Sequence, residues 1–491
     1  MKTIVKYSLI LFLVIPVVLI SQEIVDHPDK LTFPELVFDP PHPSEYRTEL
    51  SNGMVVYIAE DKELPLINVS VLLHGGDAWE PVEKTGLASL TGTMMREGGT
   101  ETRPPDELDD EIDFLAANIS TSFGNRSGNA NLNVLSYEIE SGLDLFIDIL
   151  RNPRFDEDRI RVQRERIRQN LARRNDRTSD IESREWRYLM YGEDHYSTRG
   201  ITVETLDAIT RDDMKEFHEQ FVHPGNMMLA VAGDFDRDEM IEHLERAFEG
   251  WTPREQWNEP VPEPDHTPEP GIYMIDKPDV NQGRVSIGHL GLTEDNPDRI
   301  TVQVMNGILG GSGFTSRIVG RVRSDEGLAY SAGSAFGFGR DYPATFRAYF
   351  QSRNEACAFG AQLVVKEIER IREENVSDEE LTTQINFMLE AFPRQFASAS
   401  QIVSLYARDE FNGRDPERWL TYRDEVREVT ADNVREVAGK YLNPDDLVIL
   451  VVGKVEDILA GDPQYDASFE KMGDLEIKHL PLRDPLTLQF D

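Results

Sequence analysis

The sequence predicts an α+β protein of two homologous domains, each a mostly antiparallel sheet covered by helices. The length of 491 residues is too great for one compact core. The hydrophobic content of 39% is too high for a disordered chain. A segment that begins at Thr210 returns without gaps at Thr430. Strand-like runs also alternate with long amphipathic helices in both halves. These observations predict two domains of about 220 residues, a usual size for a single domain.

The N-terminus carries the pattern of a secretory signal. Lys2 and Lys6 precede an apolar run from Leu9 to Ile20, and the small Ser21 follows. This run is shorter than the roughly 20 residues that span a bilayer as a helix. We therefore expect residues 1–21 to be a signal peptide and the protein to be exported, periplasmic or extracellular. No transmembrane span remains after signal removal, whereas an uncleaved signal would tether the protein to the membrane.

The first domain is expected to cover residues 22–259. Val55 to Glu60 and Ile67 to Leu73 are apolar runs separated by a turn, which is typical of two strands. Pro105 to Ala117 and Glu138 to Leu150 have the apolar spacing of helices. We expect these helices to cover the sheet.

The repeated segment predicts one helix, one turn and one buried strand in each half. Each copy starts at Thr-x-Asp, continues as an amphipathic helix, passes through a proline-containing turn and ends in an apolar run at a glycine. The matching pairs are Thr210 and Thr430, Asp212 and Asp432, Glu216 and Glu436, Phe221 and Tyr441, Pro224 and Pro444, Val231 and Val451, and Gly233 and Gly453.

A proline-rich acidic stretch, Pro260 to Pro270, separates the halves and is expected to be a semi-rigid extended linker. The second domain then covers residues 271–491. It opens with strands at Gly271 to Asp276 and Arg284 to His289, joined by a turn at Pro278. This opening matches that of the first domain.

Composition excludes several classes of function. The chain has 90 acidic and 51 basic residues, a formal charge of -39, which argues against nucleic-acid binding. The acidic residues are spread along the sequence, as on a solvated surface suited to a saline habitat. Cys357 is the one cysteine, so an internal disulfide and a cysteine-based metal cluster are excluded. No GxSxG elbow, P-loop or EF-hand loop is present.

Four motifs stand out along the chain: Leu50-Ser-Asn-Gly-Met-Val-Val-Tyr-Ile, Gly86-Leu-Ala, His223-Pro-Gly-Asn-Met-Met-Leu-Ala-Val-Ala-Gly-Asp234 and Arg323-Ser-Asp-Glu-Gly-Leu-Ala-Tyr330. With these motifs the chain resembles the M16 metallopeptidases, the group of insulinase, pitrilysin and mitochondrial processing peptidase. The resemblance covers nearly all of the mature chain and implies two duplicated domains that form a half-shell.

The zinc motif of that family is degenerate here. Active members carry His-x-x-Glu-His on the helix after Gly-Leu-Ala, where two imidazoles bind zinc and the Glu acts as general base. Ser89 and Thr93 occupy the His positions, and Gly92 occupies the Glu position. The third ligand aligns with Asn170, or with Gln169 or Glu165 if the alignment slips. We therefore expect no complete catalytic site and no zinc in this chain.

The degenerate helix still has a predicted buried face. Leu87, Leu90 and Met94 form an apolar stripe, while Ser89, Gly92, Thr93 and Arg96 lie on the adjacent face. These small residues are expected either to leave a cavity where the family keeps its metal, lining a substrate site, or to belong to an ordinary packed helix with a close helix contact at Gly92.

The second half retains another part of the family motif. Active M16 sites use an arginine and a tyrosine from this half to hold substrate, and these match Arg323 and Tyr330. A guanidinium and a phenol can bind a peptide carbonyl and stabilise an oxyanion. The family's glycine-rich turn matches Gly310, Gly311 and Gly313. Without the resemblance, Arg323 would be a surface helix residue near a helix-ending glycine, and Tyr330 an interior strand residue.

Two functions follow from this pattern. In the first, the chain is the non-catalytic, substrate-binding subunit of a heterodimeric peptidase and supplies Arg323 and Tyr330, while a His-x-x-Glu-His partner holds zinc. In the second, it is a catalytically inactive structural or peptide-binding homologue. The presence of both Arg323 and Tyr330 favours the first, because a purely structural protein has no need of them.

Overall fold

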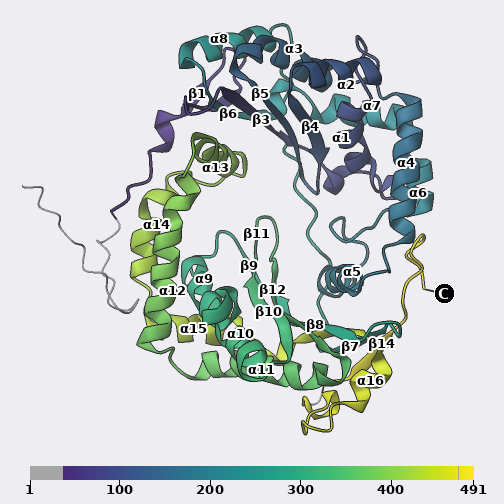
Figure 1. Cartoon of the computed structure of the whole chain (residues 1–491), viewed down its shortest axis with the longest axis vertical. Helices are drawn as coiled ribbons and strands as arrows, with labels where there is room; N and C mark the ends of the chain where they lie inside the picture. The colour runs from purple at the N-terminus through teal and green to yellow at the C-terminus, as the bar shows by residue number, and fades with distance from the viewer. Residues whose placement is uncertain (1–36, 474, 491) are drawn as a thin grey trace, which may run out of the picture. The chain divides into compact units, whose positions relative to one another are not determined.

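The structure is a computed structural model that describes residues 37–473 and 475–490. The expected signal peptide lies outside these residues. From Asp39 onward the chain forms one compact unit, which Figure 1 shows in cartoon form. Within the described part of the chain, no helix is long and apolar enough to cross a membrane.

The first half contains a six-stranded sheet. Its strands are β1 (Arg47–Glu49), β2 (Val55–Glu60), β3 (Leu66–His74), β4 (Asn118–Phe123), β5 (Ser127–Leu135) and β6 (Met227–Gly233). The order is β1-β2-β6-β3-β5-β4, and all neighbours are antiparallel except β2 and β6. The two predicted opening strands are confirmed, with β3 one residue longer at each end.

The helices of the first half cover this sheet, as predicted, except for one that packs on the second sheet and is described below. They are α1 (Leu87–Glu97), α2 (Pro105–Phe114), α3 (Ile139–Arg151), α4 (Glu157–Ala172), α5 (Thr178–Tyr191), α6 (Val203–Ala208), α7 (Arg211–Phe221) and α8 (Arg237–Ala247). Helix α2 ends three residues before the predicted Ala117, because Ala116 adopts a φ of 49°, which a right-handed helix cannot contain. Helix α3 lies within one residue of its predicted bounds.

The second half contains another six-stranded sheet. Its strands are β7 (Gly271–Asp276), β8 (Gln282–Leu290), β10 (Ala329–Phe336), β12 (Thr345–Arg353), β13 (Val448–Gly453) and β14 (Ile477–Leu480), in the order β10-β12-β8-β13-β7-β14. Strand β7 pairs parallel with β13 and β14, and the other pairs are antiparallel. Two short strands, β9 (Leu292–Thr293) and β11 (Phe338–Gly339), form a separate parallel pair.

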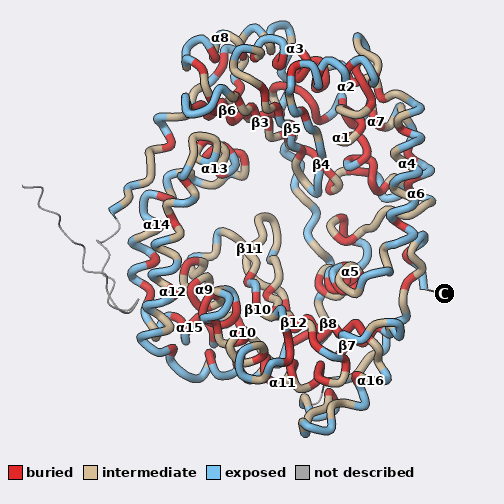
Figure 2. Tube along the Cα trace, in the orientation of Figure 1, coloured by how far each residue is buried: buried red, intermediate tan, exposed pale blue. Residues whose placement is uncertain are grey.

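The helices of the second half lie on or beside the second sheet, except for one that packs on the first sheet and is described below. They are α9 (Arg299–Asn306), α10 (Arg317–Val319), α11 (Cys357–Glu373), α12 (Asp378–Ala391), α13 (Ala399–Phe411), α14 (Arg418–Arg427), α15 (Ala431–Tyr441) and α16 (Val455–Ala460). Each half has its own hydrophobic core between sheet and helices, visible in Figure 2 as buried strands and buried helix faces.

The sequence repeat corresponds to equivalent helices and strands. Thr210 caps α7 and Thr430 caps α15, and each hydroxyl accepts a hydrogen bond from the N–H three residues later in a capping box. Both helices lead through a proline turn into a buried strand, β6 or β13, which lies inside its sheet. The predicted helix, turn and strand are therefore confirmed in both copies.

Two helices pack against the sheet of the opposite half. Helix α5 lies on β8 and β13 of the second sheet, and α13 lies on β2 and β6 of the first. A carboxylate anchors each helix. Glu182 of α5 is bound by Arg347 at 2.8 Å and by Arg284 at 2.5 Å. Glu410 of α13 accepts hydrogen bonds from Arg47 at 2.9 Å and from Tyr57 at 2.6 Å. The two halves are thus joined by an exchange of helices.

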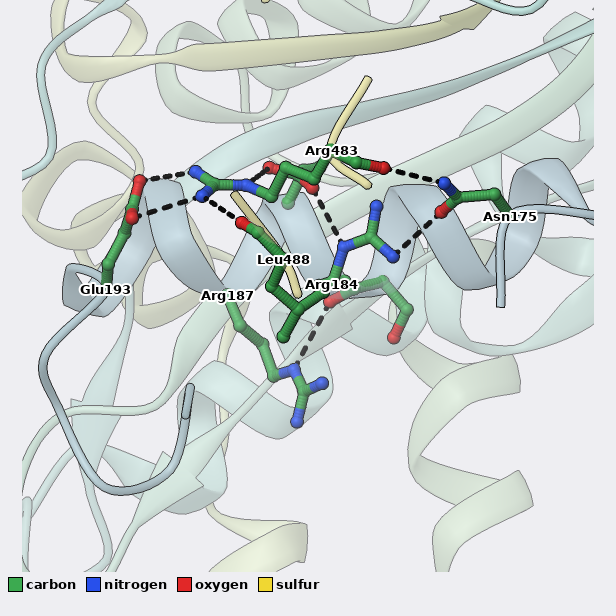
Figure 3. Close-up of polar contacts among 8 residues, drawn as sticks. Asn175, Arg184, Arg187, Glu193, Arg483 and Leu488 are labelled. Atoms are coloured by element: carbon green, nitrogen blue, oxygen red, sulfur yellow. Dashed lines mark hydrogen bonds and ion pairs between the residues drawn. The ribbon is translucent and has the colours of Figure 1, made fainter. Parts of the chain in front are cut away.

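The C-terminal segment is also anchored to the first half, as Figure 3 shows. The buried Arg483 donates hydrogen bonds to Glu185 and Glu193, and its carbonyl accepts one from Asn175 at 2.8 Å. The same guanidinium donates to the carbonyl of Leu488 at 3.1 Å, which folds the end of the described chain back on itself.

The predicted linker contains no helix or strand from Pro260 to Pro270. It nevertheless rests against the first half, because His195 Nε2 bonds to the carbonyl of Pro262 at 2.9 Å and His266 Nε2 to that of Leu189 at 3.1 Å. Linker residues form one wall of a pocket of about 800 Å³. The domain limits 22–259 and 271–491 remain predictions.

Candidate functional site

Helix α1 is the position of the degenerate zinc motif. Its N-terminus follows Gly86, whose φ of 104° favours glycine, and the Glu80 carboxylate accepts hydrogen bonds from the N–H groups of Gly86 and Ala88 at 2.8 and 2.9 Å. Burial raises the pKa of Glu80 to about 7. The predicted apolar stripe is confirmed, since Leu87, Leu90 and Met94 are all buried.

Gly92 packs against a strand. A Cβ at this position would lie 2.7 Å from the carbonyl carbon of Ser122, and the hydroxyl of Thr121 donates to the Gly92 carbonyl at 2.6 Å. The backbone of β4 therefore occupies the space beside Gly92. The prediction of a cavity is therefore wrong at Gly92. The alternative prediction, a close contact with another helix, is also wrong, because the close neighbour is a strand.

The residues at the family's metal positions do not fit zinc. Ser89 is exposed, and the Thr93 hydroxyl donates to the Ser89 carbonyl at 3.1 Å. Asn170 and Gln169 are exposed on α4, and Glu165 is paired with Arg168. Hydroxyl and amide oxygens without imidazole or thiolate are not a zinc ligand set. Across residues 37–473 and 475–490, no three His, Cys, Asp or Glu side chains form a group that could hold a metal ion.

The glycine-rich turn of the second half begins inside a π-helical segment, Gly307–Gly311, which contains Gly310 and Gly311. A second π-helical segment, Gly320–Asp325, follows the turn. Gly310 packs on β10, where a Cβ would lie 2.6 Å from the backbone nitrogen of Ser334. Gly313 is exposed with a φ of 61°, and Gly311 is also exposed. π-Helical segments are rare and concentrate at functional sites.

Arg323 and Tyr330 come together on the surface. The Arg323 guanidinium carbon lies 4.7 Å from the ring centre of Tyr330 and 4.4 Å from that of Phe314. Tyr330 is 85% exposed and Phe314 is 68% exposed, so the interior position considered for Tyr330 is wrong. The β10–β12 register shifts between Ala329 and Ser331, which makes Tyr330 the extra residue of a bulge. Bulges often redirect a side chain beside a functional site.

Helix α12 is joined by hydrogen bonds to the residues around the glycine-rich turn. Arg317 donates two hydrogen bonds to Glu380, at 2.6 and 3.0 Å, and the Ser312 hydroxyl donates to Gln384. Gly307 leaves room for Gln384, since a Cβ there would lie 2.6 Å from its amide oxygen. Burial acts to raise the pKa of Glu380, but Arg317 and the Ser377 N–H outweigh burial and lower the pKa to about 2.

Sequence reasoning missed Phe314, Glu380 and Gln384. Phe314 directly follows Gly313, and an aromatic residue at a glycine turn is a weak signal that could have been used. No sequence pattern connects Gln384 to a serine 72 residues earlier. We call Phe314, Arg323 and Tyr330 the aromatic–arginine stack.

The two duplicated domains, together with α1 and the glycine-rich turn, have the arrangement expected of an M16 peptidase. Family models agree with this class: the model described as "Insulinase (Peptidase family M16)" matches residues 55–196, and the one described as "Peptidase M16 inactive domain" matches residues 208–388. The chain belongs to the M16 peptidase family.

Individual relatives are distant. The chain is 23% identical over 437 residues to a probable mitochondrial-processing peptidase subunit beta of Arabidopsis thaliana, covering 85% of this chain and 79% of that protein. A crystal structure titled as a peptidase M16 inactive domain from Pseudomonas fluorescens has a TM-score of 0.75 at 23% identity, covering 83% and 97%. The periplasmic protease PqqL of Escherichia coli has a TM-score of 0.69 at 14% identity, covering 85% and 46%. At these identities the solved structures establish the fold alone.

Proposed function

We propose that this chain is the non-catalytic, substrate-binding subunit of an exported, heterodimeric M16 zinc peptidase that hydrolyses peptides. One observation carries the proposal. The chain lacks a fitting zinc ligand set on α1, yet it presents Arg323 and Tyr330 together at the surface beside the glycine-rich turn. A structural descendant has no need to expose an arginine between two aromatic rings.

The partner in this proposal is an M16 chain that carries His-x-x-Glu-His. It supplies the zinc ion, for which Ser89, Gly92, Thr93 and Asn170 offer no ligand set. This chain supplies Arg323 and Tyr330, whose N–H and O–H groups can hold a bound peptide. The name of the Arabidopsis relative, a subunit of a processing peptidase, supports such a division of labour.

Export remains part of the proposal. Lys2, Lys6 and the apolar run from Leu9 to Ile20 favour a secretory signal. The fold likeness to a protein titled as a periplasmic protease is consistent with that location.

The test begins with native affinity purification of the tagged chain from its own host, followed by mass spectrometry. We expect a near-stoichiometric partner of similar size with His-x-x-Glu-His and zinc. Recovery of the chain alone, or with unrelated envelope proteins, would instead favour the inactive structural or peptide-binding homologue.

A substitution then tests the substrate-side role in the assembled pair. Arg323→Ala should lower kcat/KM for peptide cleavage about tenfold or more without preventing assembly, because a charge-assisted hydrogen bond is lost. Arg161→Ala is the matched control, since Arg161 is an exposed arginine whose partner is Asp158 at 2.7 Å. Unchanged kinetics for Arg323→Ala would remove the substrate-side role.

A further inference from the structure

The side chain of Arg323 has no polar partner within the described chain. Its guanidinium makes no hydrogen bond or ion pair with residues 37–473 or 475–490, although the chain carries far more carboxylates than cations. The two acidic residues next to it in sequence are already bound. Arg321 pairs with Asp325 at 3.4 Å and with Glu326 at 3.0 Å. The charge of Arg323 is therefore available to a ligand.

The two aromatic rings restrict how a ligand can approach this charge. Phe314 and Tyr330 lie within 4.4 and 4.7 Å of the guanidinium carbon and stabilise the cation through their π-systems. Contacts of this kind leave the N–H groups, which lie in the guanidinium plane, free to donate. Five N–H donors in a fixed fork match the two oxygens of a carboxylate better than the single oxygen of a peptide carbonyl.

The loop that carries Phe314 is held in place. Gln384 binds Ser312, which precedes Phe314 in the chain, and Glu380 binds Arg317, which follows it. Both partners lie on successive turns of α12, so this helix fixes the backbone on both sides of Phe314. The stack is in this sense preorganised, which lowers the entropy cost of binding.

We infer that the aromatic–arginine stack binds a carboxylate of a peptide, and that the exposed faces of Phe314 and Tyr330 contact an apolar side chain beside it. The inference rests on the proposed function and names its substrate class: peptides that present a carboxylate next to an apolar residue. A carboxylate comes either from the peptide C-terminus or from an Asp or Glu side chain.

Calorimetry with three synthetic peptides tests the inference on the purified protein. The probes are Ala-Ala-Ala-Ala-Phe as the free acid, the same peptide with a C-terminal amide, and the amide Ala-Ala-Ala-Asp-Phe. We expect the free acid to bind about tenfold or more tightly than the plain amide, the usual effect of a charge-assisted hydrogen-bond pair. If the Asp-containing amide matches the free acid, a side-chain carboxylate also serves; if it matches the plain amide, the C-terminus is the source.

Variants assign the preference to the stack. Arg323→Ala should remove the difference between free acid and amide, and Phe314→Ala should weaken the free acid several-fold. Two controls should behave as the unaltered protein: Arg161→Ala, and Phe114→Ala, which removes an aromatic ring that is 87% exposed on α2.

Equal affinity of the unaltered protein for free acid and amide, no binding of any of the three peptides, or a preference that survives Arg323→Ala would overturn the inference. The proposed function is tested by a different measurement, peptide cleavage by the assembled pair, so the two proposals can be contradicted independently. Loss of cleavage in Arg323→Ala without a carboxylate preference would leave the substrate-side role standing and remove only the carboxylate.

Discussion

At the scale of single residues, the packing of Gly92 against β4 restricts which side chains this position of α1 can carry. The Glu of His-x-x-Glu-His belongs at this position, but the backbone of β4 lies where any side chain would begin. A side chain larger than that of glycine at residue 92 therefore conflicts with the packing of α1 against the sheet. Ser89, by contrast, is exposed and free to vary.

Gly92→Ala should destabilise the protein by about 1–3 kcal/mol, the usual cost of overpacking. Gly439→Ala is the matched control, because Gly439 also lies in a helix but a Cβ there meets nothing within 4 Å. The control should stabilise by roughly 0.5–1 kcal/mol through helix propensity. Urea unfolding of both variants gives their free energies of unfolding. If these change in the same direction in Gly92→Ala and Gly439→Ala, the packing described for Gly92 is contradicted.

At the scale of elements, the exchanged helices α5 and α13 decide how the halves associate. Each helix buries an apolar face on the opposite sheet and adds one carboxylate that the other half binds. For α5 the apolar partners include Ile181, Trp186 and Met190. A buried carboxylate costs free energy unless its partners remain, so these anchors specify which surface each helix covers.

Glu182→Ala should destabilise the protein by about 3 kcal/mol, because Arg284 and Arg347 would lose their shared carboxylate. Arg187→Ala on the same helix is the control, since Arg187 is exposed and bonds only to backbone carbonyls. Chemical denaturation should separate the two variants clearly. Equal stability would mean that α5 is held by its apolar face alone.

The contact of α12 with the glycine-rich turn should depend on pH. The folded-state pKa of Glu380, about 2, lies below the ordinary value of 4.5. As the pH falls, Glu380 therefore binds a proton in the unfolded chain before it does so in the folded chain. The stabilisation that ionised Glu380 provides above pH 4.5 is lost between pH 4.5 and about 2. Glu380→Gln should flatten the stability profile in this window, whereas Glu379→Gln should not. Thermal unfolding across pH 2–5 is the measurement.

At the scale of the whole molecule, a cluster around His74 joins the two halves. The His74 ring stacks on Phe411 at the end of α13, with centroids 3.9 Å apart, and its Nε2 lies 2.7 Å from the amide nitrogen of Gln256. Arg126 of the first half pairs with Asp341 of the second at 3.0 Å. Burial, aided by Arg340 and Arg126, lowers the pKa of His74 to about 4.

Acid should therefore weaken the contact between the halves. Between pH 6.5 and about 4 the unfolded chain binds a proton at His74 that the folded chain does not, so stability falls as the pH falls through this range. His74→Phe keeps a ring against Phe411 and should reduce that pH dependence. Hydrogen exchange of α13 between pH 7 and 4 reports the contact; an identical profile in the variant would exclude His74 as the titrating group.

The sequence alone predicted several of the elements, because helices and strands depend largely on local patterns. The spacing of apolar residues predicted β2, β3 and β7, and the Thr caps at 210 and 430 predicted equivalent helices in both halves. The residue types of Ser89, Gly92 and Thr93 also led us to expect no zinc at α1, and this expectation stays a prediction.

Only the tertiary structure decided which residues meet. The exchange of α5 and α13, the strand beside Gly92 and the hold of Gln384 on Ser312 all join segments far apart in the chain, and no periodicity records such pairs. The same holds for the stack. Sequence placed Arg323 and Tyr330 seven residues apart, but a β-bulge and a glycine turn bring Phe314 beside them. The physical reason is that side-chain proximity depends on how the backbone packs in space, which local sequence patterns do not specify.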